Sequence, residues 1–329
     1  MRRRDVLKAG LAAGGILAVG RGGDAWPAEG RARVVVIKAD DRADGVRRAV
    51  RLLGVAGFER KRVVVKPNFN SADPFPGSTH PETLEALVGW LGGAGAARVT
   101  VADRSGMGNT REAMEAKGVF AQGRKLGYDA VVLDELRERD WVPHRLPGGH
   151  WRRGVLFPRL LEEAESIVST CCLKTHRFGG HFTLSLKNSV GAVAKYGPDN
   201  YNYMSELHGA RAQRLMIAEI NQVYRPALIL LDGMEAFVDG GPESGPKAAP
   251  GVLIAGTDRV AVDAVGVAVL RLHGTTPAVS AGPIFRQEQI ARAAELGIGV
   301  GRPDLIDLAT DDQAGQIFLA RLRPLLLAT

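Results

Sequence analysis

The chain has 329 residues, of which 45% are hydrophobic and 24% are charged, so it is long enough to bury a large core. This composition excludes a disordered, collagen-like or coiled-coil protein. The formal net charge is +7, but residues 1–28 contribute +3 of it, with five basic side chains against two acidic ones. The remaining +4 is dispersed, and no basic stretch is interleaved with aromatic residues, so binding to nucleic acid is not expected.

The segment MRRRDVLKAGLAAGGILAVG at the start of the chain has the layout of a secretory signal peptide. A basic segment precedes the apolar residues 9–20, which are too few to span a bilayer as a helix, so no stable membrane span is expected. The pair Arg3-Arg4 begins a stretch that resembles the twin-arginine consensus. We therefore expect residues 1–28 to direct the protein through the twin-arginine export machinery to the periplasm, with cleavage after Ala25 or Ala28.

Twin-arginine substrates are exported folded, often with a cofactor already inserted, and the identity of any cofactor here is unknown. The only cysteines are the adjacent Cys171 and Cys172, and the chain has no C-x-x-C pair. A cysteine-ligated iron–sulfur cluster or zinc ribbon is therefore not expected. Both cysteines are predicted to pack in or beside a buried strand.

In the rest of the chain, segments typical of strands alternate with segments typical of helices. Strands are predicted at residues 31–39, 61–68, 98–106, 128–135, 166–174, 226–236 and 251–256, and helices at 44–53, 79–96, 109–127, 204–224 and after 257. Residues 137–157 are expected to form a hairpin excursion. The alternation predicts an α/β fold, with a mostly parallel or mixed central sheet and helices on both faces. No linker divides residues 29–329, so we expect a single domain.

Polar residues follow five of these strands. They are Lys66 and Asn68, Asp103 and Ser105, Lys174 and His176, Asp232 and Glu235, and residues 257–259. In an open parallel sheet the carboxyl ends of the strands share one edge, and ligands bind in the crevice outside it. The sequence therefore predicts that these segments converge on one site.

The basic residues of these segments favour an anionic ligand. Loops that run into helix N-termini, predicted at 104–110 and around Gly179 and Gly180, would present free backbone N–H groups to an anion. Lys66, Lys174, Arg177 and Lys187 are the expected cations for a phosphate or carboxylate. The alternative is that Lys66 and Lys174 pair internally with Asp103, Asp232 or Asp263.

His176 is the candidate for proton exchange, because imidazole titrates near neutral pH. His176 and His181, with Asp232 or Glu235, also suggest a metal site, but their spacing matches no standard zinc motif, so metal binding is left unknown. The remaining histidines, His208 among them, are expected at a helix start or on the surface. Asp263 lies in an otherwise apolar helix and needs a partner, for which a lysine is favoured over a metal.

Taken together, these segments resemble a bacterial and archaeal family known as domain of unknown function 362. The resemblance rests on VVVKPNFN, PETLEALVGWLGGAGAARVTVADRSG, CCLKTH, FTLSLKNSVGAV, LILLDGMEAFVDGGPESGP and GTDRVAVDAVG, in the family's order, over about residues 60–273. Residues 274–329 would then be a C-terminal helical extension. The resemblance implies that Lys66, Asn68, Lys174, His176, Lys187, Asn188, Asp232 and Glu235 belong to one family site. It implies no reaction, and this chain lacks the cysteines of the ferredoxin-like domain that many members carry.

Two functions follow from the sequence. The first is an exported protein with an anion-binding crevice, acting as an enzyme on a small phosphate- or carboxylate-bearing molecule, with Lys66, Lys174 and His176 as catalytic candidates. Asn68, Asp103, Ser105, Arg177, Gly179, Gly180, His181, Lys187, Asn188, Asp232 and Glu235 are the candidate binding residues. The alternative is a non-catalytic periplasmic protein that binds a ligand, metal or cofactor loaded before export. Whether the protein is an enzyme is left open by the sequence.

Overall fold

The computed structural model describes residues 30–106 and 108–328, and the predicted signal segment lies outside these residues. The strands are β1 (Ala32–Lys38), β2 (Arg62–Lys66), β3 (Arg98–Asp103), β4 (Asp129–Val132), β5 (Trp141–His144), β6 (Val155–Pro158), β7 (Ser166–His176), β8 (His181–Thr183), β9 (Leu228–Phe237), β10 (Lys247–Ala248), β11 (Val252–Gly256) and β12 (Ile306–Ala309). All but β5 and β6 belong to one ten-stranded sheet in the order β12-β1-β11-β9-β7-β2-β3-β4, with β8 paired to β7 and β10 paired to β9.

The sheet is mixed. Strands β4, β3, β2, β7 and β9 run parallel to one another, and β11 runs antiparallel to both β9 and β1. The predicted α/β fold with a mostly parallel or mixed sheet is therefore confirmed. Because β11 is reversed, residues 257–259 at its end lie at the opposite edge from the ends of β2, β3, β7 and β9. The expectation that five strand ends share one edge was wrong for this strand.

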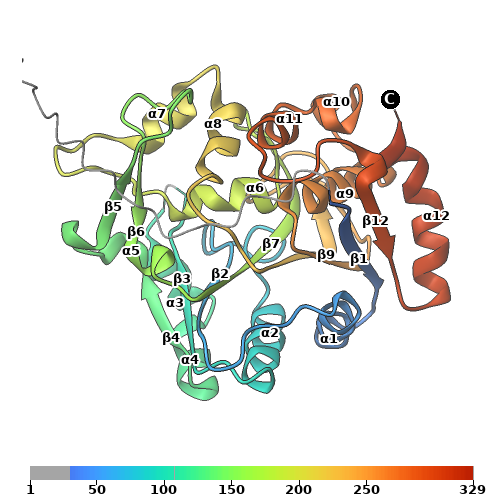
Figure 1. Ribbon diagram of the computed structural model, residues 1–329, viewed down its shortest axis with the longest axis horizontal. Coiled ribbons are helices and arrows are strands. Elements are labelled where there is room, and N and C mark those ends of the chain that lie inside the picture. The colour runs from blue at the N-terminus through green and yellow to red at the C-terminus, as the bar shows by residue number, and fades with distance from the viewer. Residues whose placement is uncertain (1–29, 107, 329) are drawn as a thin grey trace, which may run out of the picture.

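Helices cover both faces of the sheet (Figure 1). The α-helices are α1 (Arg42–Leu53), α2 (Pro81–Gly93), α3 (Thr110–Ala116), α4 (Val119–Leu126), α5 (Arg159–Glu162), α6 (Ser185–Asn188), α7 (Tyr203–Gly209), α8 (Gln213–Ile220), α9 (Arg259–Leu272), α10 (Pro277–Ser280), α11 (Glu288–Glu295) and α12 (Gln313–Leu327). Short 3-10 helices occupy η1 (Leu133–Glu135), η2 (Glu138–Asp140), η3 (Ser189–Ala192), η4 (Ile284–Arg286) and η5 (Pro303–Leu305). One apolar cluster lies between the sheet and α1, α2 and α4, and two others lie on the opposite face, beneath α9 and beneath α7 and α8.

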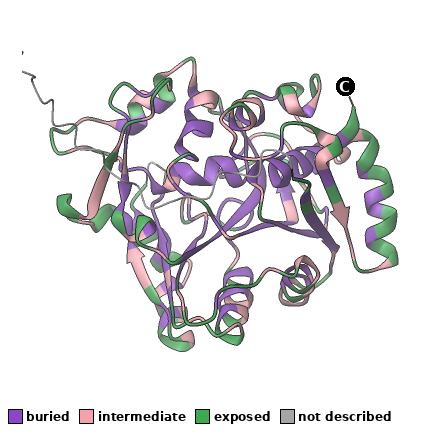
Figure 2. Cartoon of the chain, viewed as in Figure 1, coloured by how far each residue is buried: buried purple, intermediate pink, exposed green. Residues whose placement is uncertain are grey.

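Strand β7 is the centre of the molecule, and every one of its eleven residues is buried (Figure 2). Cys171 and Cys172 lie in this strand as free, buried thiols. The pairing of β7 with β9 shifts register between Cys172 and Lys174, which marks a bulge. The polar end of β7 therefore begins where its regular pairing is interrupted.

The segment after β7 differs from the expectation. Residues 177–180 form the turn of an antiparallel hairpin, in which His176 pairs with His181 across β7 and β8. A helix N-terminus was predicted there, but the strand reverses instead and returns along β7. The first helix after the hairpin is α6, which begins at Ser185.

The C-terminal segment contributes more than helices, because β12 pairs in parallel with β1 and extends the sheet at one edge. The predicted hairpin excursion is formed by β5 and β6, which pair antiparallel in a separate small sheet. None of the helices in the described part of the chain has both the length and the apolar character that a bilayer crossing would need.

Gly241 holds the loop after β9 against the end of β7. Its φ is +61°, and a Cβ built at this position would lie 2.1 Å from the carbonyl oxygen of Thr175. The N–H of Arg177 donates to the Gly241 carbonyl at 3.3 Å, so the two backbones are in direct contact. A side chain at position 241 would have to separate them.

We therefore expect Gly241→Ala to lower the free energy of unfolding by more than about 2 kcal/mol, because the methyl group clashes with backbone and not with a flexible side chain. Gly274→Ala is the matched control, since Gly274 also has a positive φ of +77° but no atom within 4 Å of an added Cβ. This control should lose only about 1 kcal/mol. Urea denaturation of both variants measures the difference, and equal losses would contradict the role given to the close approach.

Candidate functional site

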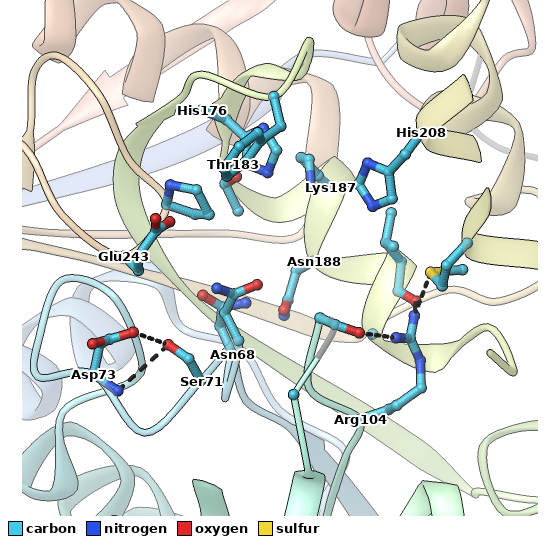
Figure 3. Close-up of a pocket in the computed structure, with 18 residues that line it drawn as sticks. Asn68, Ser71, Asp73, Arg104, His176, Thr183, Lys187, Asn188, His208 and Glu243 are labelled. Atoms are coloured by element: carbon cyan, nitrogen blue, oxygen red, sulfur yellow. Dashed lines mark hydrogen bonds between the residues drawn. The ribbon is translucent and has the colours of Figure 1, made fainter. Parts of the chain in front are cut away.

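A cavity of about 340 Å³ lies at the carboxyl ends of β2, β3 and β7, beside α6 and α7 (Figure 3). Asn68 comes from the loop after β2, Arg104 follows β3, and His176 ends β7. Lys187 is on α6 and His208 is on α7. Three of the strand ends named from the sequence therefore reach one cavity, and two short helices complete its wall.

Lys66 lies beneath this cavity and has an internal partner. Its Nζ is 2.5 Å from Oδ1 of Asp103, and both side chains are buried. Asp103 also accepts the backbone N–H groups of Phe69 and Arg104. Burial lowers the pKa of Lys66 and raises that of Asp103, whereas their mutual attraction opposes both shifts. Internal pairing, the alternative considered from the sequence, describes Lys66 in this structure.

Asn188 is bonded internally as well. Its side-chain oxygen accepts from Lys66 at 3.3 Å, and its NH2 lies within donating distance of the carbonyl oxygens of Lys66 and Thr170 and of the Ser169 hydroxyl. A Cβ at Gly191, one turn further along, would lie 2.8 Å from Nζ of Lys66. The segment from α6 into η3 is thus fitted closely over the Lys66–Asp103 pair.

Lys174 has no carboxylate partner among the described residues. Its Nζ donates to Oδ1 of Asn68 at 2.9 Å and to the carbonyl of Gly77 at 2.5 Å, and the residue is fully buried. Burial lowers its pKa. The ammonium lies behind Asn68, whose side chain lines the cavity. Lys174 therefore contributes positive charge to the cavity and fixes the orientation of the Asn68 amide.

Arg104 is a buried guanidinium held by neutral groups. It donates to the carbonyls of Ser105 and Gly106 at 2.7 and 3.1 Å and also to the carbonyl of Val190, while its Nε has no partner within the described residues. Burial lowers its pKa to about 10. The side chain joins the loop after β3 to η3 and remains charged at neutral pH.

Lys187 is the least satisfied of these cations. It is 8% exposed and lines the cavity, and within residues 30–106 and 108–328 its Nζ has no hydrogen bond or ion pair. Burial, reinforced by the positive charges of Lys174 and Arg104, lowers the pKa of Lys187 to about 7. A charge in such a place is stable only with an external partner.

His176 and His208 flank this lysine. Burial and the charge of Lys187 lower the pKa of both, that of His176 well below its usual value, so both rings are neutral at pH 7. Nδ1 of His176 is buried with no hydrogen-bond partner in the described part of the chain, and it lies near Gly180, where an added Cβ would be 2.9 Å away. Nδ1 of His208 lies 3.1 Å from the side-chain amide of Gln213, which holds the ring in place beside Lys187.

Several residues named from the sequence lie at the edge of the cavity or outside it. Arg177 pairs with Glu243, and Glu243 lines the cavity at its mouth. Gly179 and Gly180 form the hairpin turn, and His181 has a φ of +63° and does not line the cavity. Ser105 is buried and donates to the carbonyl of Phe69.

The two acidic residues of β9 lie apart from the cavity. Asp232 is buried against α1 and α2, where it accepts from Arg42 at 3.2 Å and from Thr83 at 2.5 Å. Glu235 is partly exposed and pairs with Lys247 at 3.0 Å. The structure therefore does not bring Asp232 or Glu235 together with the cations of the cavity.

Asp263 has backbone partners in place of the expected lysine. Its two carboxylate oxygens accept the N–H groups of Ser185 and Leu186 at 2.8 and 3.0 Å, at the start of α6. Burial nonetheless raises its pKa to about 7. In the part of the chain that the structure describes, no three His, Cys, Asp or Glu side chains are grouped as a metal site would require.

Sequence reasoning did not assign His208 or Arg104 to the site. His208 was expected at the surface, and its helix gave no signal that it would face α6. Arg104 lies in the predicted strand segment 98–106, but only its neighbours Asp103 and Ser105 were named as candidates. The available signal was its position directly after Asp103. Because Asp103 pairs with Lys66, it leaves the adjacent arginine without a carboxylate of its own.

The sequence matches the family model described as Domain of unknown function (DUF362) over residues 63–268. The chain belongs to this family. A comparison with curated proteins gives no match. Among solved structures, the lactate racemase apoprotein from Thermoanaerobacterium thermosaccharolyticum is similar, with 18% sequence identity and a TM-score of 0.41. The similarity covers 64% of this chain and 51% of that one, so the DUF362 protein spans about half the length of that structure.

The two lysines of α6 and β2 should respond oppositely to the same substitution. We expect Lys66→Met to destabilise the DUF362 protein by about 3–5 kcal/mol, because it leaves Asp103 buried without a cation. Lys187→Met should stabilise it by about 2–4 kcal/mol at pH 6, because it removes a buried charge that has no partner.

The gain from Lys187→Met should shrink as the pH rises. The folded pKa of Lys187, about 7, lies below its unfolded value, so between about pH 7 and pH 10 unfolding takes up a proton and the wild type becomes more stable. Denaturation of the wild type and of Lys187→Met at pH 6, 8 and 9.5 measures this change in the stability difference. A Lys187→Met protein less stable than wild type at pH 6 would show that the lysine has a structural partner.

Proposed function

We propose that the cavity binds a small molecule bearing a carboxylate or phosphate, and that the protein acts on this molecule as an enzyme. The observation that carries the proposal is the ammonium of Lys187, which lines the cavity with no partner among the described residues. Arg104 and Lys174 add two buried charges that also lack an ion pair with any described carboxylate. An anion would supply the missing negative charge.

Neither acidic side chain that lines the cavity forms an ion pair with Lys187 within the described residues. Asp73 accepts from the Ser71 hydroxyl at 2.6 Å, and Glu243 is already paired with Arg177. The NH2 group of Asn68 makes no hydrogen bond within the described chain, so it is available to a ligand oxygen. Charge-assisted hydrogen bonds from Lys187 and a fixed donor from Asn68 are the interactions that recognise a small anion in a dry site.

The two histidines support a catalytic role over simple binding. His176 and His208 are neutral at pH 7 and both line the cavity next to Lys187. A neutral imidazole can give or take a proton, and a bound anion would raise its pKa toward neutrality. His176 therefore remains the candidate for proton exchange, as the sequence suggested, with His208 as a second candidate.

Lys187→Met should weaken the binding of phosphate or of a small carboxylate by about tenfold to a hundredfold, the loss expected for one charge-assisted hydrogen bond. Isothermal titration calorimetry with inorganic phosphate, acetate and malonate at pH 6.5 measures this change. The matched control is Lys125→Met, since Lys125 is exposed on α4 and pairs only with Glu85. Equal affinities in the two variants, or no binding of any of these anions by the wild type, would refute the proposal.

We also propose that residues 1–28 export the folded protein through the twin-arginine pathway. The sequence features that support this are the pair Arg3-Arg4 followed by a short apolar stretch. We expect replacement of both arginines by lysine to retain the protein in the cytoplasm, because the twin-arginine machinery reads the guanidinium pair and not the charge alone. Arg2→Lys is the matched control and should be exported. Equal amounts of both variants in the periplasmic fraction would exclude this route.

A further inference from the structure

The position of Lys187 leaves its amine open to the cavity, so that the amine can react as well as carry a charge. Residue 187 is on the one-turn helix α6, directly after the β7–β8 hairpin, and its Cε would lie 2.8 Å from a Cβ added at Gly180. The absence of a side chain at position 180 therefore leaves room for the lysine stem. The Nζ atom lies at the cavity wall with no group of the described chain to accept its protons.

The groups around this amine are two basic side chains, Lys174 and Arg104, and two neutral imidazoles, His176 and His208. Arg104, His176 and His208 line the same cavity, from the loop after β3, from β7 and from α7, and Lys174 of β7 acts on the amine through its charge. At neutral pH about half of the Lys187 side chains are unprotonated, because its pKa is about 7.

The nearby carboxylates are engaged elsewhere. Asp103 is held by Lys66, and Asp263 accepts the two amides that begin α6. Asp73 is bonded to Ser71, and Glu243 is bonded to Arg177 at the cavity mouth. No carboxylate of the described residues therefore pairs with Lys187 to hold its proton.

We propose that Lys187 is a nucleophile that forms an imine with the carbonyl group of a small acid bound in the cavity. The proposal rests on the function inferred above, since the acidic group of the substrate is what the cavity cations would hold. It narrows the substrate class to carbonyl compounds that carry a carboxylate or phosphate. A desolvated lysine beside other cations is the arrangement that makes an amine nucleophilic near neutral pH.

The step balances without any other reactant. The ammonium of Lys187 first gives a proton to the neutral imidazole of His176 or His208, and the lone pair of Nζ then attacks the carbonyl carbon, so that a C–N bond forms and the C=O π bond breaks. A proton passes from this nitrogen to the oxygen to give a carbinolamine. The imidazolium then returns its proton to that oxygen, which leaves as water and gives the protonated imine. The imine keeps a positive charge at nitrogen and withdraws electrons from the neighbouring carbon, so it activates the substrate for further chemistry.

The other buried lysines do not have this freedom. Lys66 is bound to Asp103, and Lys174 donates to Asn68 and Gly77 with no exposed surface. Neither Nζ lines the cavity. Lys187 is therefore the lysine of the described chain whose amine meets the cavity.

Reductive trapping tests the proposal. The wild-type protein is incubated with pyruvate and sodium cyanoborohydride and then mapped by peptide mass spectrometry. We expect one carboxyethyl group on Lys187, formed at least about tenfold faster than on any other lysine. The labelling rate of Lys187 relative to that of exposed lysines in the same sample should be highest near pH 7 and fall toward pH 10, because Lys187 gains no further free amine above its pKa, whereas an ordinary lysine continues to lose its proton.

Three controls separate this proposal from the proposed function. Propionate has the carboxylate without the ketone and should slow the trapping of pyruvate, whereas acetone has the ketone without the charge and should label Lys187 at least about tenfold more slowly. Lys187→Arg keeps the positive charge and should give no adduct at position 187. Binding of pyruvate or propionate by calorimetry with no adduct would overturn the imine and leave anion binding intact. Failure of the wild type to bind either acid would overturn both, and labelling spread evenly over exposed lysines would overturn the role of Lys187.

Discussion

The buried ion pair between Lys66 and Asp103 is the constraint on which the candidate site depends. It joins the ends of two neighbouring parallel strands, and Asn188 ties the same pair to α6. Two backbone N–H groups that donate to Asp103 fix the loops that follow β2 and β3. A buried pair of this kind gains stability only when nearly all of its hydrogen-bonding groups are satisfied, and here they are. Three separate segments, residues 66–69, 103–104 and the helix α6, are therefore held in one geometry beneath the cavity.

The comparison of Lys66 with Lys187 shows which of the two buried lysines indicates a function. Both lysines are almost completely buried, and both have a lowered pKa, yet only Lys66 has a carboxylate beside it. A fold selected for stability alone would place an apolar side chain at position 187, because an apolar residue carries no desolvation penalty. Residues that lower the stability of the fold are expected at functional sites, because they are retained there for binding or catalysis. For this reason the unpaired lysine, and not the paired one, indicates function.

The sequence predicted the α/β class and the strand ends that reach the cavity, because β-branched runs and the polar residues after them are local signals. It could not predict the direction of β11, since a strand sequence reads the same in a parallel and an antiparallel pair. Partners were equally hidden: Asp263 was expected to meet a lysine and meets two backbone amides, and Asp232 is bonded to Arg42 and Thr83 on the other side of the sheet. Such pairings depend on which face of a strand a residue occupies and on the tertiary fold, neither of which spacing determines.

An anion site and a nucleophilic amine make opposite demands on Lys187, because a bound anion raises the pKa of a nearby amine and keeps it protonated. The conflict is removed when the acidic group lies closer to Arg104 and to the Asn68 amide than to Nζ. Arg104 stays charged at neutral pH and attracts an anion, and the amide of Asn68, oriented by Lys174, can donate a hydrogen bond to it, so neither group transfers its proton to the anion. Formation of the imine then restores a positive charge at nitrogen, which attracts the same acidic group more strongly than the free amine does. The positive charges of Arg104 and of the imine thus favour the covalent state over the empty cavity. This requires a substrate whose acidic group reaches Arg104 and Asn68 while its carbonyl group reaches Lys187.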